Sequence, residues 1–87
     1  MIKFKQNGQF LKLETRIISK GDKQGEEFLL AKFLYVDDVW EFTVFQNASN
    51  DLYDKIRMLN AGENVPTELE ISKYKDKTLV KLINVGE

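Results

Sequence analysis

Hydrophobic and polar positions alternate along most of the chain, as they do in β-strands. Strand-like runs cover residues 10–20, 26–36, 39–46, 65–73 and 78–85, and polar or glycine-containing stretches separate them. Residues 1–6 are either an extension of the first run or a separate short strand. The pattern therefore predicts five main strands.

One stretch, residues 47–62, has a helical period instead. Its apolar side chains fall at i, i+4 and i+7 and form one stripe along about two turns: Leu52, Ile56 and Leu59. Ser49 or Asn50 can cap the first amides, and Gly62 can supply the left-handed residue that ends the helix. The expected order is three strands, a helix and two strands.

The second run is apolar on both faces. Phe28, Leu30, Leu34 and Val36 alternate with Leu29, Ala31, Phe33 and Tyr35, and Lys32 interrupts the first set. A domain of this size has little material to cover a second apolar face, so one face is expected to meet a ligand or another protein chain. A bulge could exchange the two faces, so the sequence leaves the register open.

The third run separates its faces more clearly. Trp40, Phe42 and Val44 alternate with Glu41 and Thr43, which predicts that Trp40 points into the core. Asp37-Asp38 is the expected turn before this strand, and residues 74–77 form the expected turn between the last two strands.

The order of elements predicts a mainly β domain spanning residues 1–87. Five strands with one short helix between strands 3 and 4 fit a five-stranded Greek-key barrel of the OB type, in which the helix closes one end. An SH3-like barrel and a two-layer α+β sandwich are the alternatives.

Composition narrows the functional classes. The 87 residues contain no cysteine and no histidine, which removes the commonest metal ligands and the commonest general base. No phosphate-binding glycine loop or metal-ligand spacing is present. The expectation is a protein that is not an enzyme and has no cofactor and no metal. No stretch has the length of a membrane span or the apolar run of a signal peptide, so we expect a cytoplasmic protein with no membrane partner.

The net charge of −1 hides an uneven distribution. Residues 1–25 are basic, residues 26–54 are strongly acidic, and the segment 73–81 holds four lysines against one aspartate. Proteins that hold phosphates show a basic patch more often than a basic total. The total argues weakly against a nucleic-acid ligand, and the clustering argues weakly for one.

Two segments carry a family resemblance: SKGDKQGEEF after the basic first strand, and the closing ELEISKYKDKTLVKLINV. The layout resembles the small OB-fold single-stranded DNA-binding proteins of phages and mobile elements. The resemblance covers most of the chain in layout and is specific over about twenty residues at the end, which are similar to the last two strands of such domains.

The first hypothesis is non-specific binding of single-stranded nucleic acid, with DNA favoured over RNA. It needs cations along a groove and rings on which bases stack. The candidate residues lie on the first two strands, at the end of the fourth strand and in the two loops of the expected ligand face: Lys12, Arg16, Lys20, Lys23, Lys32, Phe33, Tyr35, Lys73, Tyr74, Lys75 and Lys77. Tyr74 is the first stacking candidate, because it shares its face with Glu68, Glu70 and Ser72.

The second hypothesis is a protein-interaction module, such as a dimeric adaptor or inhibitor, whose interface is the apolar second strand. A homo-oligomer, for example a dimer, is compatible with either hypothesis. A dimer that ignores nucleic acid would favour the second.

Overall fold

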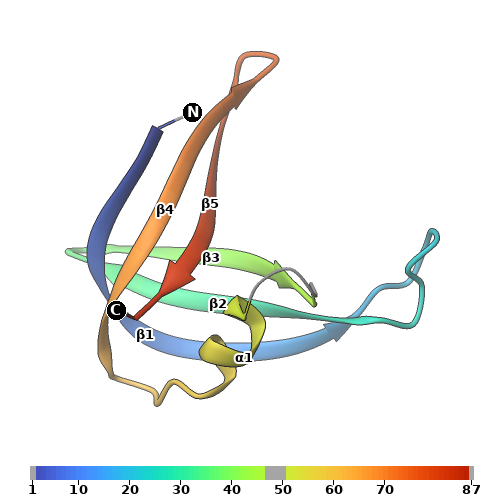
Figure 1. The fold of residues 1–87 in the computed structure, drawn as a ribbon, viewed down its shortest axis with the longest axis horizontal. Coiled ribbons are helices and arrows are strands. Elements are labelled where there is room, and N and C mark those ends of the chain that lie inside the picture. The colour runs from blue at the N-terminus through green and yellow to red at the C-terminus, as the bar shows by residue number, and fades with distance from the viewer. Residues whose placement is uncertain (1, 47–50, 87) are drawn as a thin grey trace.

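The computed structural model describes residues 2–46 and 51–86 and has a mainly β fold (Figure 1). Five antiparallel strands and one short helix follow one another along the chain: β1 (Ile2–Ile17), β2 (Glu27–Tyr35), β3 (Asp38–Phe45), α1 (Leu52–Arg57), β4 (Asn64–Tyr74) and β5 (Lys77–Val85). The sheet has the order β3-β2-β1-β4-β5 and curls into a half-barrel. This order, with a helix between the third and fourth strands, agrees with the predicted OB-type fold.

Strand β1 is shared by the two halves of the sheet. Its first half pairs with β4, from Ile2 opposite Ile71 to Gln9 opposite Asn64, and its second half pairs with β2. A β-bulge between Phe10 and Lys12 bends the strand between these two pairings. Residues 1–6 therefore extend the first strand, so far as the structure describes them, and do not form a separate one.

Strand β2 supplies much of the core. Leu29, Ala31, Phe33 and Tyr35 are buried, and Phe33 has no exposed surface. Phe33 packs edge-on against Phe10, with the ring centroids 5.4 Å apart, and lies 6.1 Å from Phe42. The opposite face of β2 is only half-buried along Phe28, Leu30, Lys32 and Leu34.

A buried chain of hydrogen bonds joins three strands across the barrel. The Tyr35 hydroxyl donates to Thr67 Oγ1 at 2.8 Å, and the Thr67 hydroxyl donates to the Gln6 carbonyl at 2.6 Å. Burial raises the pKa of Tyr35, so the phenol stays protonated and able to donate. The Tyr35 ring fits because residue 8 is glycine: a Cβ there would lie 2.7 Å from a ring carbon.

Helix α1 closes one end of the barrel, as predicted, but is shorter than its sequence pattern indicates. Leu52 and Ile56 are buried and Leu59 is half-buried, which confirms the apolar stripe. Tyr53 is buried as well, and its hydroxyl donates to Glu27 at 3.3 Å. The proposed caps Ser49 and Asn50 lie outside the described residues.

The predicted role of Gly62 in ending the helix is wrong. The helix ends at Arg57 with Met58 in a right-handed conformation, because the chain turns away there toward β4. Gly62 has φ +88 in that later turn, where its amide donates to the Phe10 carbonyl at 2.7 Å.

The two short hairpin turns differ in how well the sequence predicts them. The turn after β2 is Val36-Asp37 instead of the expected Asp37-Asp38, because Asp38 pairs with Tyr35 and begins β3. Val36 has φ 57, which is strained for a β-branched residue. The turn within residues 74–77 is confirmed: Tyr74 pairs with Lys77, and Lys75 and Asp76 both have positive φ, as a type I′ turn requires.

Candidate nucleic-acid interface

The outward face of β1, β2 and β3 carries an aromatic pair. The strand registers place Arg16 opposite Phe28 and Phe28 opposite Phe45, so the three side chains form one row across the sheet. The two phenylalanine rings are tilted by 37° with centroids 5.7 Å apart. Phe45 is 53% exposed. This row presents an aromatic surface with a guanidinium group at one end.

The cations of β1 are bound to an acid on the same face. Glu14 lies 2.8 Å from Arg16 and 2.9 Å from Lys12. Hydrogen bonds from Arg16 and then from Lys12 lower the pKa of the Glu14 carboxyl from 4.5 to about 2. Part of the positive charge that the sequence shows in this strand is therefore neutralised locally.

The cation of β2 is also near an acid. Lys32 lies directly opposite Lys12 on β1 and opposite Glu41 on β3, and its ammonium group is 3.8 Å from the Glu41 carboxylate. Both groups of this pair are substantially exposed, so the contact is weak and a phosphate can replace it.

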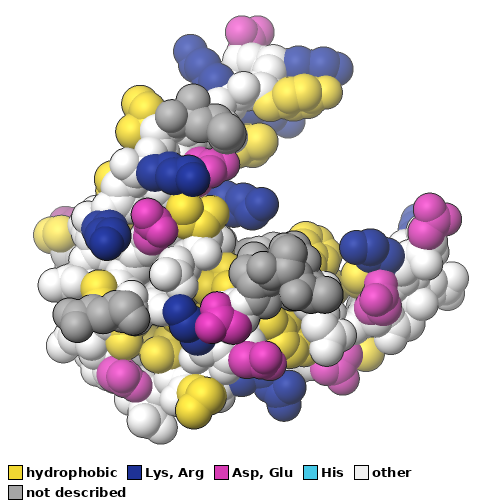
Figure 2. Space-filling view, viewed as in Figure 1, with side chains coloured by type: hydrophobic (Ala, Val, Ile, Leu, Met, Phe, Trp, Pro, Cys, Tyr) yellow, Lys and Arg dark blue, Asp and Glu magenta, His cyan; other side chains and the backbone are white. Residues whose placement is uncertain are grey.

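A cleft separates this face from the β4–β5 hairpin. Figure 2 shows the molecule hollowed between the arm that ends in that hairpin and the arm that ends in the loop after β1. A pocket of about 140 Å³ brings together Thr43 and Phe45 of β3 with Lys81 and Ile83 of β5. Phe45, one ring of the aromatic pair, thus borders a surface of β5 that carries a lysine.

The tip of the β4–β5 hairpin combines an aromatic ring with lysines. Tyr74 is 63% exposed, and the Lys75 ammonium group lies 5.5 Å from the centre of its ring. The pairing of Tyr74 with Lys77 and of Lys73 with Thr78 puts Lys73 and Tyr74 on opposite faces of the hairpin. Tyr74 has the outward direction that the sequence predicts, whereas Lys73 does not share its face.

The loop after β1 holds the other two predicted cations, Lys20 and Lys23, both exposed. Backbone hydrogen bonds from Ile18 to Glu26 and from Gly25 back to Ile18 close the base of this loop. Lys23 and Phe45 line one small pocket there together with Glu26 and Glu27, so this lysine lies near one ring of the aromatic pair and near two carboxylates.

The prediction that Phe33 and Tyr35 are ligand-facing is wrong. Both side chains lie in the core, where the inner face of β2 packs against β1 and β3. The sequence itself argues against the prediction. Lys32 must face solvent, and side chains alternate along a strand, so residues 33 and 35 point to the opposite face. The same signal points to Phe28, which shares a face with Lys32. Sequence reasoning missed both Phe28 and Phe45.

Trp40 is not a core residue, although it lies on the predicted side of β3. Its indole stacks on Phe42, with centroids 6.4 Å apart and planes at 18°, but it is 42% exposed. The half-barrel is open at that end, so part of the Trp40 side chain stays exposed. Trp40 is at the far end of β3 from Phe45 and does not belong to the aromatic pair.

Among residues 2–46 and 51–86, no group of three or more His, Cys, Asp or Glu side chains is placed to hold a metal ion. In the same part of the chain no helix has the length and apolar character needed to cross a membrane.

Comparison with known proteins found no matching family model, no matching curated protein and no matching solved structure.

Proposed function

We propose that this protein binds single-stranded nucleic acid without sequence preference and without catalysis, and that DNA is the ligand to test first. The observation that carries the proposal is the Phe28–Phe45 pair, which is partly exposed on an outward sheet face beside Arg16 and Lys23. Proteins that bind single strands combine exposed rings with cations in this way.

In this proposal the nucleic acid contacts both walls of the cleft. Bases stack on Phe45 on one wall and on Tyr74 on the other, and each stack contributes about 1–3 kcal/mol. Phosphates contact the lysines of the hairpin tip and of the loop after β1 (Lys20, Lys23, Lys75 and Lys77), together with Lys81. The resemblance to phage-type single-stranded DNA-binding proteins belongs to the same proposal, as does a role in replication or recombination.

A titration in two salt concentrations tests the proposal. A fluorescein-labelled oligo-dT of about 20 nucleotides exceeds the roughly 4–16 nucleotides that one OB barrel occupies. We expect saturable anisotropy at about 50 mM salt and a steep loss of affinity at about 200 mM. The label, and not Trp40, is the reporter, because Trp40 lies at the other end of β3. A folded sample that leaves the strand unbound at the lower salt would end the proposal.

Two alanine variants locate the interface. Phe45→Ala and Tyr74→Ala should each weaken binding by about 1–3 kcal/mol with little loss of fold, since both side chains are more than half exposed. Met58→Ala is the matched control, because it removes an exposed apolar side chain at the end of α1. Equal effects of all three variants would show that the rings have no special role.

A second candidate function uses the same face for another purpose. On the face of the aromatic pair, Leu30 and Leu34 are half-buried and Val39 is more than half exposed, which suits a protein interface or a dimer. Sedimentation at several concentrations, with and without oligo-dT, separates the two functions. A dimer that dissociates on Phe45→Glu and ignores oligo-dT would favour the protein-interaction module.

A further inference from the structure

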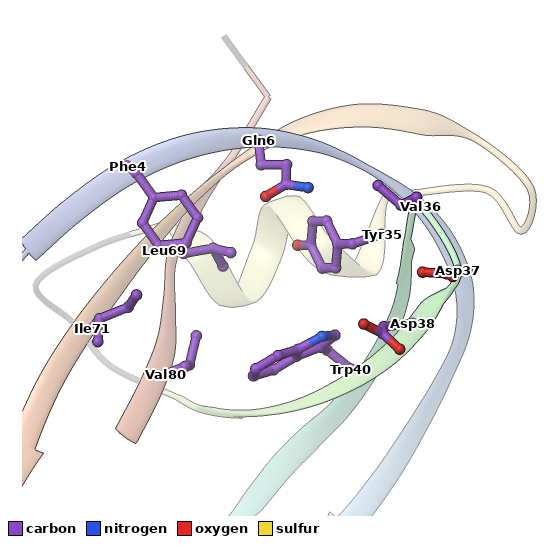
Figure 3. A pocket seen from close by; sticks show the side chains of 10 residues that line it. All are labelled: Phe4, Gln6, Tyr35, Val36, Asp37, Asp38, Trp40, Leu69, Ile71 and Val80. Atoms are coloured by element: carbon purple, nitrogen blue, oxygen red, sulfur yellow. The ribbon is translucent and has the colours of Figure 1, made fainter. Parts of the chain in front are cut away.

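The end of the barrel opposite α1 is open and contains a large pocket. Helix α1 lies beside Glu27 at the start of β2, whereas this pocket lies at Tyr35, where β2 ends. It has a volume of about 450 Å³, within the range of ligand sites. Figure 3 looks into it and shows side chains from β1, β3, β4 and β5 arranged around the opening.

The pocket has an apolar floor and an acidic rim. Phe4, Leu69, Ile71 and Val80 form one side, and the Trp40 indole faces them across the opening (Figure 3). Asp37 and Asp38 stand at the edge beside Trp40. Neither carboxylate has an ion pair or a side-chain hydrogen bond with any described residue. A site of this kind favours a ligand with a cation next to a bulky apolar group, and it repels phosphates.

The backbone at this pocket points to a peptide as the ligand. Strand β3 ends the sheet, so its outer edge has no hydrogen-bonded strand beside it among the described residues. An extended peptide can pair with such an edge, and every second side chain of that peptide then points the same way. The edge residues Asp38 and Trp40 are themselves pocket residues, so backbone pairing and side-chain insertion take place together.

We propose that this pocket binds an extended segment of a partner protein that carries a lysine or arginine beside a bulky apolar residue. The apolar side chain fills the space between Trp40 and Ile71, and the cation meets Asp37 and Asp38 at the rim. The proposal is independent of nucleic-acid binding, because the acidic pocket and the Phe28–Phe45 row lie at opposite ends of β3. The protein can therefore hold a partner and a nucleic acid at once.

Selection from a displayed library of random dodecapeptides tests the proposal with the full chain as bait. The expected result is enrichment of peptides in which a basic residue neighbours a large apolar one. Enrichment should persist in the presence of excess oligo-dT, and an enriched peptide should change Trp40 fluorescence on binding. A folded bait that enriches no peptide, or enriches peptides without a cation, would overturn the proposal. Peptides displaced by oligo-dT would also overturn it.

Matched variants place the peptide in this pocket. Asp37→Asn combined with Asp38→Asn keeps the shape of the rim and removes its charge, so the affinity of an enriched peptide should fall at least about tenfold. Asp54→Asn removes an exposed carboxylate from α1 and should leave the affinity unchanged. An equal loss in both variants, or no loss in the first, would contradict the assignment. Oligo-dT binding of the first variant, measured in parallel, reports on the proposed function separately.

Discussion

The two faces of β2 have nearly the same apolar content and different environments. The inner face is buried in the core and consists of Leu29, Ala31, Phe33 and Tyr35. On the outer face, Phe28 and Leu30 are only half-buried. The difference lies in their neighbours: the outer face is flanked by charged groups such as Arg16 and Lys32 and the inner face by other rings. The hydrophobicity of its residues therefore does not by itself identify the buried face of a strand. A charged residue within one face, here Lys32, identifies that face as the outer one.

The largest expected effect separates these two faces directly. Phe33→Ala should lower the free energy of unfolding by about 3–5 kcal/mol, because it empties a fully buried site between Phe10 and Phe42. Phe28→Ala should cost much less stability but weaken oligo-dT binding by about 1–3 kcal/mol. Urea unfolding and anisotropy titrations on both variants check the pair. Similar losses of stability would remove the distinction between the faces.

A single added methyl group tests how closely the inner face is packed. Gly8→Ala should destabilise the fold by about 1–3 kcal/mol, because the new Cβ would approach the Tyr35 ring to 2.7 Å. Thermal unfolding measures the loss. Gly21→Ala is not a suitable control, because that glycine has φ +90; Ala61→Gly, in the exposed turn before β4, is expected to change stability far less. A neutral Gly8→Ala would mean that the ring has room to move.

The outer face should respond to charge more than to volume. Glu14→Gln frees Arg16 and Lys12 from their shared carboxylate, so oligo-dT affinity should rise roughly two- to fivefold at about 50 mM salt. The pKa of Glu14 is depressed, so its stabilising contribution is present above pH 4.5 and is lost as the pH falls toward about 2. The variant should therefore show a shallower loss of stability between those pH values. Unchanged affinity would place the ligand away from β1.

The smallest effect is expected at the turn that ends β2. Val36→Asn should stabilise the fold by about 0.5–1 kcal/mol, because asparagine tolerates the positive φ that strains valine and the Val36 side chain is almost fully exposed. Thermal unfolding checks the gain, and oligo-dT binding should not change. A loss of stability would show that the exposed Val36 side chain contributes to packing at the pocket.

The order of the strands and the helix along the chain, and most strand bounds, could be predicted from the sequence, because they depend on local periodicity. Features that depend on contacts distant in sequence could not. The Phe10/Lys12 bulge keeps Phe10 on the inner face and is invisible to strict alternation. The exposure of Trp40 follows from the barrel being open at that end, which no local pattern records.

The candidate site was predicted less well than the fold, although one part needed only local reasoning. The outward direction of Tyr74 follows from its parity with acidic neighbours on β4. Phe28 could have been identified in the same way, because it shares a strand face with Lys32. The proximity of Phe45 and Lys81, in contrast, depends on the curl of the sheet. The pairing of Glu14 with two cations needs the side-chain geometry of β1.

The sharing of β1 between both halves of the sheet has a consequence for the folding rate. Strands β1, β2 and β3 are joined by connections of fewer than ten residues, but the contact between Gln6 and Thr67 closes a loop of 61 residues. Closing such a loop costs chain entropy, and the stabilising contacts form only once the loop is closed. We therefore expect the β1–β4 pairing to form after the transition state. Phe4→Ala should then mainly accelerate unfolding, whereas Leu29→Ala should slow refolding, as stopped-flow measurements would show.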